Sequence, residues 1–331
     1  MKLLVTTGFG NIIQGGADIW VNNFIELVLP KLRAPYIIFV DGKRPPGFIS
    51  NYEHFHFHEE NILKSERLLK QCDEIHFLHA NYHYRPHLWQ HKDKWSTIFV
   101  HAYLPDMLDY NDSVRQFNTK VDSKSVKFLL ENCKKRIWIG LDKKSKLFDD
   151  FPNKTKVVSN FYEFKHNLDV VDSNMIGFAA RMETRKCPHF IEGLDSLLFT
   201  ANDGIRWWKK YMNLDTSKWK NYGYSHEHTE KFFKKDWGIS HSAHIYEPFG
   251  YSIFQAVDFG KIPILAHDWI PKYDYPLRAS SVKEFHQIYE RICRMGLEER
   301  RDLLFPLREY LTEHYCNKQR WVDQMLRIYN E

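Results

Sequence analysis

Short apolar segments and amphipathic segments alternate along almost the whole of this 331-residue chain. Segments such as Leu3–Thr6, Tyr36–Val40 and Thr97–Val100 are typical of buried strands, whereas Ala17–Leu29 places its apolar side chains on one helical face. Strands that alternate with helices form a parallel sheet with helices on both faces. The chain is therefore predicted to be an α/β protein.

The alternation restarts after a polar segment at Asn167–Ser173, which indicates two domains. We expect an N-terminal domain at 1–160, a C-terminal domain at 161–315 and a final segment, 316–331, whose helix crosses back to the first domain. Further strands are predicted at Ile75–Leu78, Arg136–Ile139, Val157–Asn160, Met175–Ala179 and Ile262–Leu265, and helices at Asn61–Gln71, Ser123–Asn132, Val282–Leu311 and Lys318–Tyr329.

Composition excludes several classes of protein. Five scattered cysteines without a CxxC pair argue against a disulfide framework or a zinc site and favour a reducing cytoplasm, which is the host cytoplasm if the protein is a phage protein. No apolar run is long enough to span a membrane. The net charge of +5 is a modest bias that is compatible with a polyanionic partner or an acidic cofactor.

Two cations follow the predicted strand at Met175–Ala179. Arg181 and Lys186 stand five positions apart, directly after this strand. In open parallel sheets, ligands bind at the carboxyl ends of the strands. Arg181 can donate two parallel hydrogen bonds to a phosphate and Lys186 can supply a point charge, so the pair suits a diphosphate. A solvated Arg/Lys pair is the plainer interpretation of this segment taken alone.

A second segment combines a carboxylate, a glycine turn and a helix. Glu247-Pro248-Phe249-Gly250 is followed by an apolar run that begins at Tyr251, and then by Gly260-Lys261-Ile262-Pro263. Gly250 permits a tight turn, and the N-terminus of the next helix offers backbone amides to an anion. Glu247 can accept from sugar hydroxyls, and Gln255 can bond a vicinal diol. Together the two segments suit a nucleotide-sugar.

These residues resemble the donor site of retaining GT-B glycosyltransferases. The resemblance implies two Rossmann-like, doubly wound parallel-sheet domains with an interdomain cleft, and a UDP-sugar as donor with no further cofactor and no required divalent metal. Gln255 stands where the family usually has a second Glu that contacts ribose. The donor-binding residues that it implies are Gly15, Gly16, Arg181, Lys186, Gly223, Tyr224, Glu247, Phe249, Gly250, Tyr251, Ser252 and Gln255.

The sequence offers fewer cues to the residues that would bind the acceptor. His101 ends the predicted strand at Thr97–Val100, and in the family a His at this place contacts the donor sugar. Asp106 or Asp109 could orient an acceptor hydroxyl, although Asp106 also suits a helix N-cap. We assign the catalytic roles to His101, Asp106, Arg181, Lys186 and Glu247. In family members the leaving diphosphate is described as taking the acceptor proton, so no protein base is required.

Two further compositional clusters bear on the acceptor. Histidines and aromatic residues of 76–91 could line an acceptor groove; a metal site there is disfavoured because Pro86 interrupts the helix that His79, His83 and His87 would need. Basic residues lie at 134–146, and between Arg206 and Lys220 they are interleaved with Trp207, Trp208 and Trp219. That interleaving is the footprint of nucleic-acid contact, although solvated charges and buried Trp explain it too.

Within the family, the order of landmarks is similar to that of the DNA α-glucosyltransferases of T-even bacteriophages, on the cues Asn160-Phe161, the strand that ends at His101 and Gly260–Pro263. The resemblance implies double-stranded DNA with 5-hydroxymethylcytosine as acceptor and requires the base to be flipped out. Two alternatives remain open. One is transfer to a surface polysaccharide or lipid-linked glycan, and the other is a non-catalytic module that binds sugar or nucleic acid.

Overall fold

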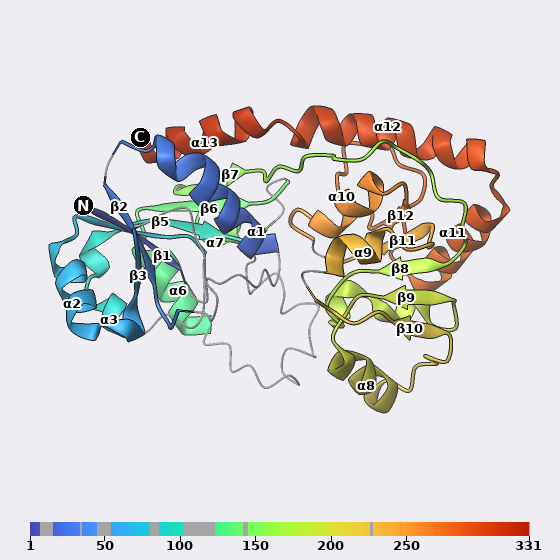
Figure 1. Ribbon diagram of the computed structural model, residues 1–331, viewed down its shortest axis with the longest axis horizontal. Coiled ribbons are helices and arrows are strands. Elements are labelled where there is room, and N and C mark those ends of the chain that lie inside the picture. Colours follow the sequence, from blue (N-terminus) through green and yellow to red (C-terminus); the bar gives the residue numbers. More distant parts are fainter. Residues whose placement is uncertain are drawn as a thin grey trace. The chain divides into compact units, whose positions relative to one another are not determined.

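The computed structural model (Figure 1) describes residues 1–6, 16–33, 35–44, 54–79, 86–101, 123–141, 145–225, 228–245 and 247–330. The chain divides into two compact units. The N-terminal unit contains the described residues up to Asn160 together with those from Gln319 onward, and the C-terminal unit contains Phe161–Lys318. Each unit is built around one parallel sheet, which confirms the predicted α/β class.

The N-terminal unit has a seven-stranded parallel sheet in the order β3-β2-β1-β4-β5-β6-β7. Leu3, Leu4 and Val5 lie in β1, an interior strand of this sheet, and are fully buried, as expected for a strand with helices on both faces. The strands are β1 (Lys2–Thr6), β2 (Tyr36–Val40), β3 (Phe55–Phe57), β4 (Glu74–Phe77), β5 (Trp95–Val100), β6 (Lys135–Ile139) and β7 (Thr155–Val158).

The final helix of the chain, α13 (Lys318–Asn330), packs in the N-terminal unit. Its Trp321 meets Trp20 edge to face at 6.2 Å between ring centroids, and Tyr329 packs on Phe24 at 5.5 Å. The C-terminal end of the chain therefore completes the core of the N-terminal unit. The other helices of this unit are α1 (Gly16–Asn23), α2 (Ile62–Gln71), α3 (Pro86–Trp89), α6 (Ser123–Asn132) and α7 (Leu147–Asp150).

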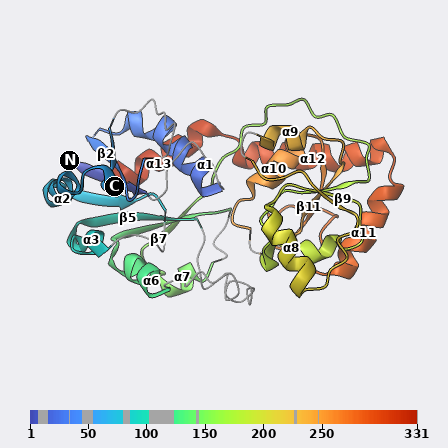
Figure 2. The ribbon, with the colours of Figure 1, turned by 60° about the horizontal axis from the view of Figure 1, so that its bottom comes forward.

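The C-terminal unit has a five-stranded parallel sheet in the order β10-β9-β8-β11-β12. Its strands are β8 (Ile176–Phe178), β9 (Ser196–Leu198), β10 (Trp219–Asn221), β11 (Ile239–Ser242) and β12 (Ile262–Leu265). Figure 2 shows helices on both faces of this sheet. They are α8 (Asn202–Tyr211), α9 (Thr229–Phe233), α10 (Tyr251–Asp258), α11 (Val282–Arg294) and α12 (Leu297–Tyr315).

Two predicted helices need correction, and three short strands were not predicted. The expected helix at 282–311 is two helices, because extended backbone at Met295 ends α11 and the Glu299 side chain accepts from the Gly296 N–H to cap α12. The expected helix at 17–29 ends as α1 at Asn23 and continues as a π-helical turn, Phe24–Val28. The three-residue strands β3, β9 and β10 were not predicted, because so short a segment carries too little alternation to read.

Both sheets reverse their strand order at one point. In the C-terminal unit the reversal lies between β8 and β11, which are hydrogen-bonded neighbours although they are far apart in sequence. The connections that leave these two strands run to opposite sides, and in open parallel sheets ligands bind outside the carboxyl ends of the strands at such a point. The segments after β8 and after β11 are therefore the places where a doubly wound sheet binds its ligand.

Candidate active site

The two segments singled out from the sequence meet at this reversal point. Lys186 closes a 3₁₀ turn, Thr184–Lys186, that follows β8, and Glu247 lies in the loop after β11. The Lys186 ammonium donates to Oε2 of Glu247. His244, from the same loop as Glu247, places Nδ1 at 3.4 Å from Glu247 Oε2 and at 3.5 Å from Lys186 Nζ.

Burial makes these charges depend on one another. The side chains of Lys186 and Glu247 are 10% and 14% exposed, and that of His244 is 1% exposed. Burial works against ionisation of Glu247, but the nearby Lys186 and His244 hold its pKa well below the usual range. Burial lowers the pKa of Lys186, and Glu247 opposes that shift. Burial, and then the charge of Lys186, lowers the pKa of His244 to about 4, so His244 is neutral at neutral pH.

One backbone hydrogen bond and one side-chain contact join the two loops next to this group. The Ile245 N–H donates to the Arg185 carbonyl at 2.8 Å. Nε2 of the buried His241 lies 2.8 Å from the Cys187 carbonyl, next to Lys186. Cys187 itself has a left-handed φ of 50°, a conformation that costs a non-glycine residue free energy and that the surrounding contacts must hold. The loop that presents Lys186 is thus fixed from the β11 side.

Arg181 is the exposed member of the predicted diphosphate pair. Its side chain is 68% exposed, and Nη1 lies 3.8 Å from Oε1 of Glu183. Glu183 also accepts from Arg185 Nε at 2.7 Å. Burial favours protonation of Glu183, but the two guanidinium groups lower its pKa below the usual range. Arg181 can therefore turn toward a solvent-borne anion, while Arg185 stays bound to Glu183.

Gly250 lies at the start of helix α10. It has a φ of +82° and precedes Tyr251, the first helical residue. Phe249 is buried and stacks on Phe254 at 4.6 Å, which anchors the turn in the core. Gln255 is half-buried in the middle of α10. Of the other predicted donor residues on this helix, Tyr251 and Ser252 are both half-buried in its first turn.

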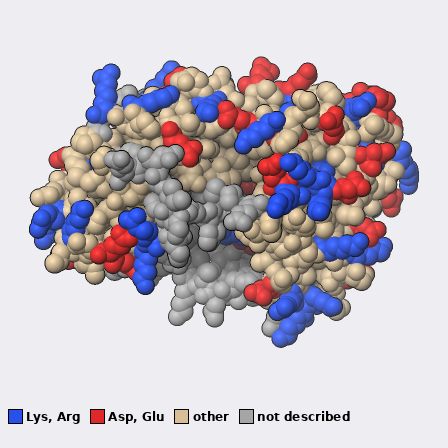
Figure 3. Space-filling view, in the orientation of Figure 1, with Lys and Arg blue, Asp and Glu red and all other residues tan. Residues whose placement is uncertain are grey.

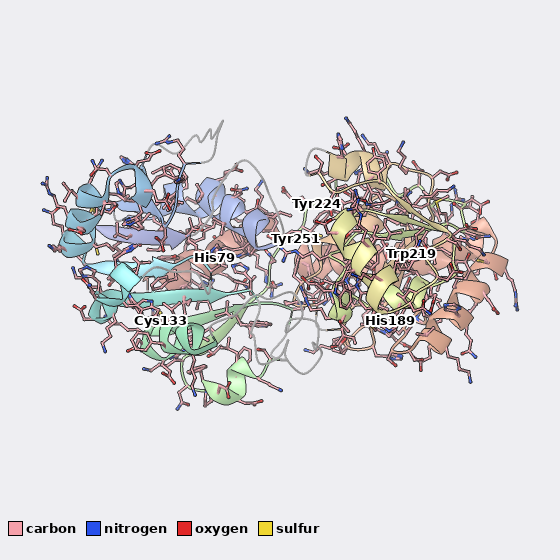
Figure 4. All side chains as sticks on the ribbon, turned by 90° about the horizontal axis from the view of Figure 1, so that it is seen from below. His79, Cys133, His189, Trp219, Tyr224 and Tyr251 are labelled. Atoms are coloured by element: carbon pink, nitrogen blue, oxygen red, sulfur yellow. The ribbon has the colours of Figure 1, made fainter. Side chains whose placement is uncertain are left out.

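The predicted nucleobase turn follows β10 at the same edge of the sheet. Gly223 has a φ of +80°, and its N–H donates to the Asn221 side chain at 3.2 Å. The Tyr224 ring is 46% exposed and packs on Phe199 at 5.1 Å. Figure 4 shows Tyr224 and Tyr251 at the same end of the C-terminal unit. An exposed aromatic ring at this end suits stacking on a base.

Asp258, at the other end of α10, was missed by the sequence reasoning. Its fully buried carboxylate accepts from the backbone N–H groups of Lys165 and His166 at 3.0 and 3.1 Å, and from the Tyr162 hydroxyl at 3.1 Å. Arg308 of α12 lies 3.7 Å away. The segment that enters the C-terminal unit is thereby fastened to α10. In the sequence, an Asp at the end of an apolar helix indicates only a surface residue.

The predicted acceptor residues belong to the N-terminal unit. His101 follows β5, and its Nε2 lies 3.2 Å from the Leu78 carbonyl while its ring meets Trp20 edge to face at 4.9 Å. Burial, and then the charge of His79, lowers the pKa of His101 to about 3. Gly16 is the first residue of α1. Gly15, Asp106 and Asp109 lie outside the described residues.

The histidine-rich segments of the N-terminal unit form a packed cluster near the carboxyl end of β2. His58 stacks on His87 at 4.1 Å, and His87 Nε2 lies 3.6 Å from the buried Asp41 carboxylate. His56 Nε2 lies 2.7 Å from the Ser65 hydroxyl. Among the residues that the structure describes, no three such side chains are arranged to hold a metal ion.

In the basic and aromatic segment around α8, two of the tryptophans and the cations lie in different environments. Trp208 and Trp219 use their indole N–H groups inside the unit, donating at 2.9 Å to the carbonyls of Met182 and Ile191. The cations on this helix and beside it are exposed instead, and Figure 3 shows Lys and Arg side chains gathered over α8. These exposed cations are Arg206, Lys209, Lys210, Lys218 and Lys220.

The lowered pKa values of His244 and His101 predict that the fold is sensitive to acid. Unfolded histidines accept a proton near pH ~6.5, whereas His244 and His101 do so only at pH values of about 4 and about 3. Between these values the unfolded chain binds more protons, so the free energy of unfolding should fall as the pH falls from about 6.5 to about 4. Urea unfolding across this range measures it. His101→Asn should flatten the slope, and a slope that is flat in the wild type would contradict the assignment.

No family model and no curated protein matches the sequence. Solved structures do match the fold. Sucrose-phosphate synthase from Thermosynechococcus elongatus has a TM-score of 0.74 and 14% identity, over 99% of this chain and 98% of that one. An α-glucosyltransferase in complex with UDP-glucose and DNA containing an abasic site has a TM-score of 0.64 and 10% identity, over 99% of both chains.

A third match is S. aureus TarM, in complex with Fondaparinux, α-GlcNAc-glycerol and UDP. It has a TM-score of 0.56 and 13% identity over 95% of this chain and 59% of TarM. Together these structures show that the chain has the GT-B fold of glycosyltransferases, as the donor-site resemblance implied. At identities this low, the likeness shows the fold alone. In the part of the chain that the structure describes, no helix is long and apolar enough to cross a membrane.

Proposed function

We propose that this protein is a retaining glycosyltransferase that moves a sugar from a UDP-sugar onto 5-hydroxymethylcytosine in double-stranded DNA. The observation that carries the enzyme class is the buried Lys186–Glu247 pair at the reversal point of a GT-B sheet, next to the Gly250 turn. Solved structures of this fold include complexes with UDP and with UDP-glucose.

The proposed reaction uses the site as follows. Arg181 and Lys186 face the diphosphate and offset the negative charge that develops as the bond from the sugar C1 to the diphosphate breaks. These two cations suffice for that role, so the proposal includes no divalent metal. Gln255 binds the ribose and Tyr224 stacks on the base. The acceptor oxygen bonds to C1 on the same face, and its proton passes to the leaving diphosphate oxygen.

Glu247 is suited to bind the sugar because its contacts with the described residues fall on only one of its two carboxylate oxygens. Lys186 and His244 both contact Oε2. Among the described residues, no hydrogen bond falls on Oε1. An ionised carboxylate is an acceptor only, so Oε1 can take hydroxyl hydrogens of the sugar. Lys186 thus keeps the Glu247 carboxylate ionised and leaves Oε1 available to accept a hydrogen bond.

The DNA acceptor rests on weaker support than the donor. Exposed cations line α8 and the adjoining strand β10, and two solved structures of the same fold, each of an α-glucosyltransferase, contain DNA. Phosphate contacts of this kind make binding fall steeply as salt rises. A glycan acceptor is the competing possibility, since TarM of the same fold was solved with α-GlcNAc-glycerol.

Mass spectrometry of hydroxymethylcytosine DNA after incubation with a panel of UDP-sugars tests the proposal. A mass increment on the DNA, lost in Arg181→Ala and retained in the presence of a metal chelator, is the expected result. An increment on a glycan but not on DNA would overturn the acceptor. No transfer to either acceptor, with UDP still bound, would leave a binding module as the function.

A further inference from the structure

The segment that follows β12, residues 266–277, is a closed loop at the same edge of the sheet as the Gly250 turn. The chain leaves β12 at Leu265 and returns beside it. There the Leu265 N–H donates to the Leu277 carbonyl and the Ala279 N–H donates to the Leu265 carbonyl, both at 2.9 Å. Compact loops whose ends meet are frequently functional. This β12 loop had no role in the sequence reasoning, although it leaves the carboxyl end of the strand next to β11.

A single guanidinium holds the β12 loop together. Arg278 donates to five backbone carbonyls of the loop, at distances from 2.7 to 3.3 Å. The planar guanidinium presents its N–H groups in fixed directions, so it can hold several acceptors in one arrangement. The five carbonyls are those of Ala266, His267, Trp269, Ile270 and Tyr273.

The β12 loop contains a residue in an unfavourable backbone conformation. Ile270 is 2% exposed and has a left-handed φ of 43°. A β-branched residue adopts this conformation at a cost in free energy, so the surrounding contacts must hold it there. The Arg278 bond to the Ile270 carbonyl, at 3.1 Å, is one of those contacts. Residues held in this way cluster at functional sites. The preceding residue, Trp269, is the one that reaches the Gly250 turn.

Trp269 connects the β12 loop to the segment that carries Glu247. Its buried indole N–H donates to the Phe249 carbonyl at 3.0 Å, and its ring meets Phe254 of α10 edge to face at 5.9 Å. Phe249 directly precedes Gly250 and stands two residues after Glu247. The bond therefore fixes the backbone between Glu247 and the start of α10.

We propose that Trp269 is a positioning residue of the donor site, which holds the Phe249 carbonyl and thereby keeps Glu247 in place, and that Arg278 holds Trp269 in turn. The inference rests on the proposed glycosyltransferase function. It assigns neither Trp269 nor Arg278 a contact with the substrate or a proton transfer. In the proposed reaction only the sugar reaches Glu247, so the effect is expected on transfer rather than on the binding of UDP.

Two matched substitutions test this role. Trp269→Phe removes the N–H and keeps an aromatic ring against Phe254. Trp237→Phe is the control, because the Trp237 indole is also buried and donates to the Phe232 carbonyl at 2.9 Å, but lies before β11 at the amino end of the sheet. Both variants should lose similar stability in urea. Only Trp269→Phe is expected to lower kcat for sugar transfer, by about tenfold, as for a small displacement of a positioned group, with the Kd for UDP little changed. Equal kinetic losses in the two variants, or no loss in Trp269→Phe, would overturn the proposal.

Amide hydrogen exchange supplies a readout that needs no enzymatic activity. The Ile253 N–H donates to the Gly250 carbonyl at 2.8 Å, so its exchange reports on the turn. We expect this exchange to be about tenfold faster in Trp269→Phe than in Trp237→Phe, the value of one hydrogen bond. Arg278→Lys keeps the charge but has fewer N–H groups for the five carbonyls, and it should accelerate the same exchange even if Trp269→Phe does not fold.

The exchange experiment separates this inference from the proposed function. Exchange in Trp269→Phe and Arg278→Lys that is no faster than in Trp237→Phe would overturn the inference whether or not the protein transfers a sugar. Faster exchange in these variants, together with no transfer by the wild type, would leave the bracing of the turn by Trp269 standing and reject the proposed function.

Discussion

Lys186→Met is expected to destabilise the fold by about 3–5 kcal/mol, because it leaves the buried Glu247 carboxylate without its cation. Lys186 and Glu247 are both largely buried, so water cannot replace the lost partner. The same variant should lose transfer by about a hundredfold or more, since it removes a charge aimed at the leaving group. Urea unfolding and initial-rate kinetics measure the two losses separately.

The double variant Lys186→Met/Glu247→Leu distinguishes chemistry from folding. Replacing both partners of a buried ion pair by apolar side chains is often neutral or stabilising. We therefore expect the free energy of unfolding to return to within about 1 kcal/mol of the wild type while transfer stays abolished. Lys209→Met, at an exposed position on α8, serves as the control and should change stability by no more than about 0.5 kcal/mol. A double variant that folds and transfers would contradict the site.

Gly250→Ala is expected to lose both stability and transfer. Its φ of +82° is left-handed, which costs a residue with a Cβ roughly 1–2 kcal/mol. The added Cβ would also stand 2.8 Å from Ile253 Cδ1 and 3.1 Å from Glu247 Cγ. The end of the Ile253 side chain can relieve the first contact by itself, whereas the second requires Glu247 to move by a few tenths of an ångström. We therefore expect transfer to fall by about tenfold or more, as for small displacements of positioned groups.

Gly193 provides a matched control for this substitution. It also has a left-handed φ, of +69°, but a Cβ there would meet nothing within 4 Å. Gly193→Ala should lower the free energy of unfolding by only about 1–2 kcal/mol, the cost of a left-handed backbone for a residue with a Cβ. It should leave the kinetics of transfer unchanged. Equal kinetic losses in the two variants would show that the contact between Gly250 and Glu247 does not matter.

The sequence was sufficient for those parts of the fold that depend on repeating local patterns. Strands such as β2 and β12 have the predicted bounds, because a short run of apolar residues that includes two isoleucines, with a charged residue at one end, defines each of them. The pairing of Lys186 with Glu247 was within reach too. Two segments that each follow a strand lie together when the strands are neighbours at a reversal point, and the motif spacing pointed to that arrangement.

Other parts depend on tertiary contacts that leave no local signature. In the sequence, His244 and His241 are polar residues in a loop or at a strand end, yet packing against Phe178 and Phe190 buries them beside Lys186 and Cys187. Asp258 reads as a helix terminus, yet it binds the backbone of Lys165 and His166, far away in sequence. Trp208 was a candidate for nucleic-acid contact in the sequence. In the structure, its indole N–H donates to the Met182 carbonyl.

A crystal structure with UDP tests the central claim most directly. The account predicts diphosphate oxygens within hydrogen-bond distance of Arg181 and Lys186, the ribose hydroxyls on Gln255 and the uracil beside Tyr224. In such a complex Glu247 Oε2 should remain bound to Lys186. UDP bound elsewhere, or at this edge with its diphosphate away from Arg181 and Lys186, would contradict the account.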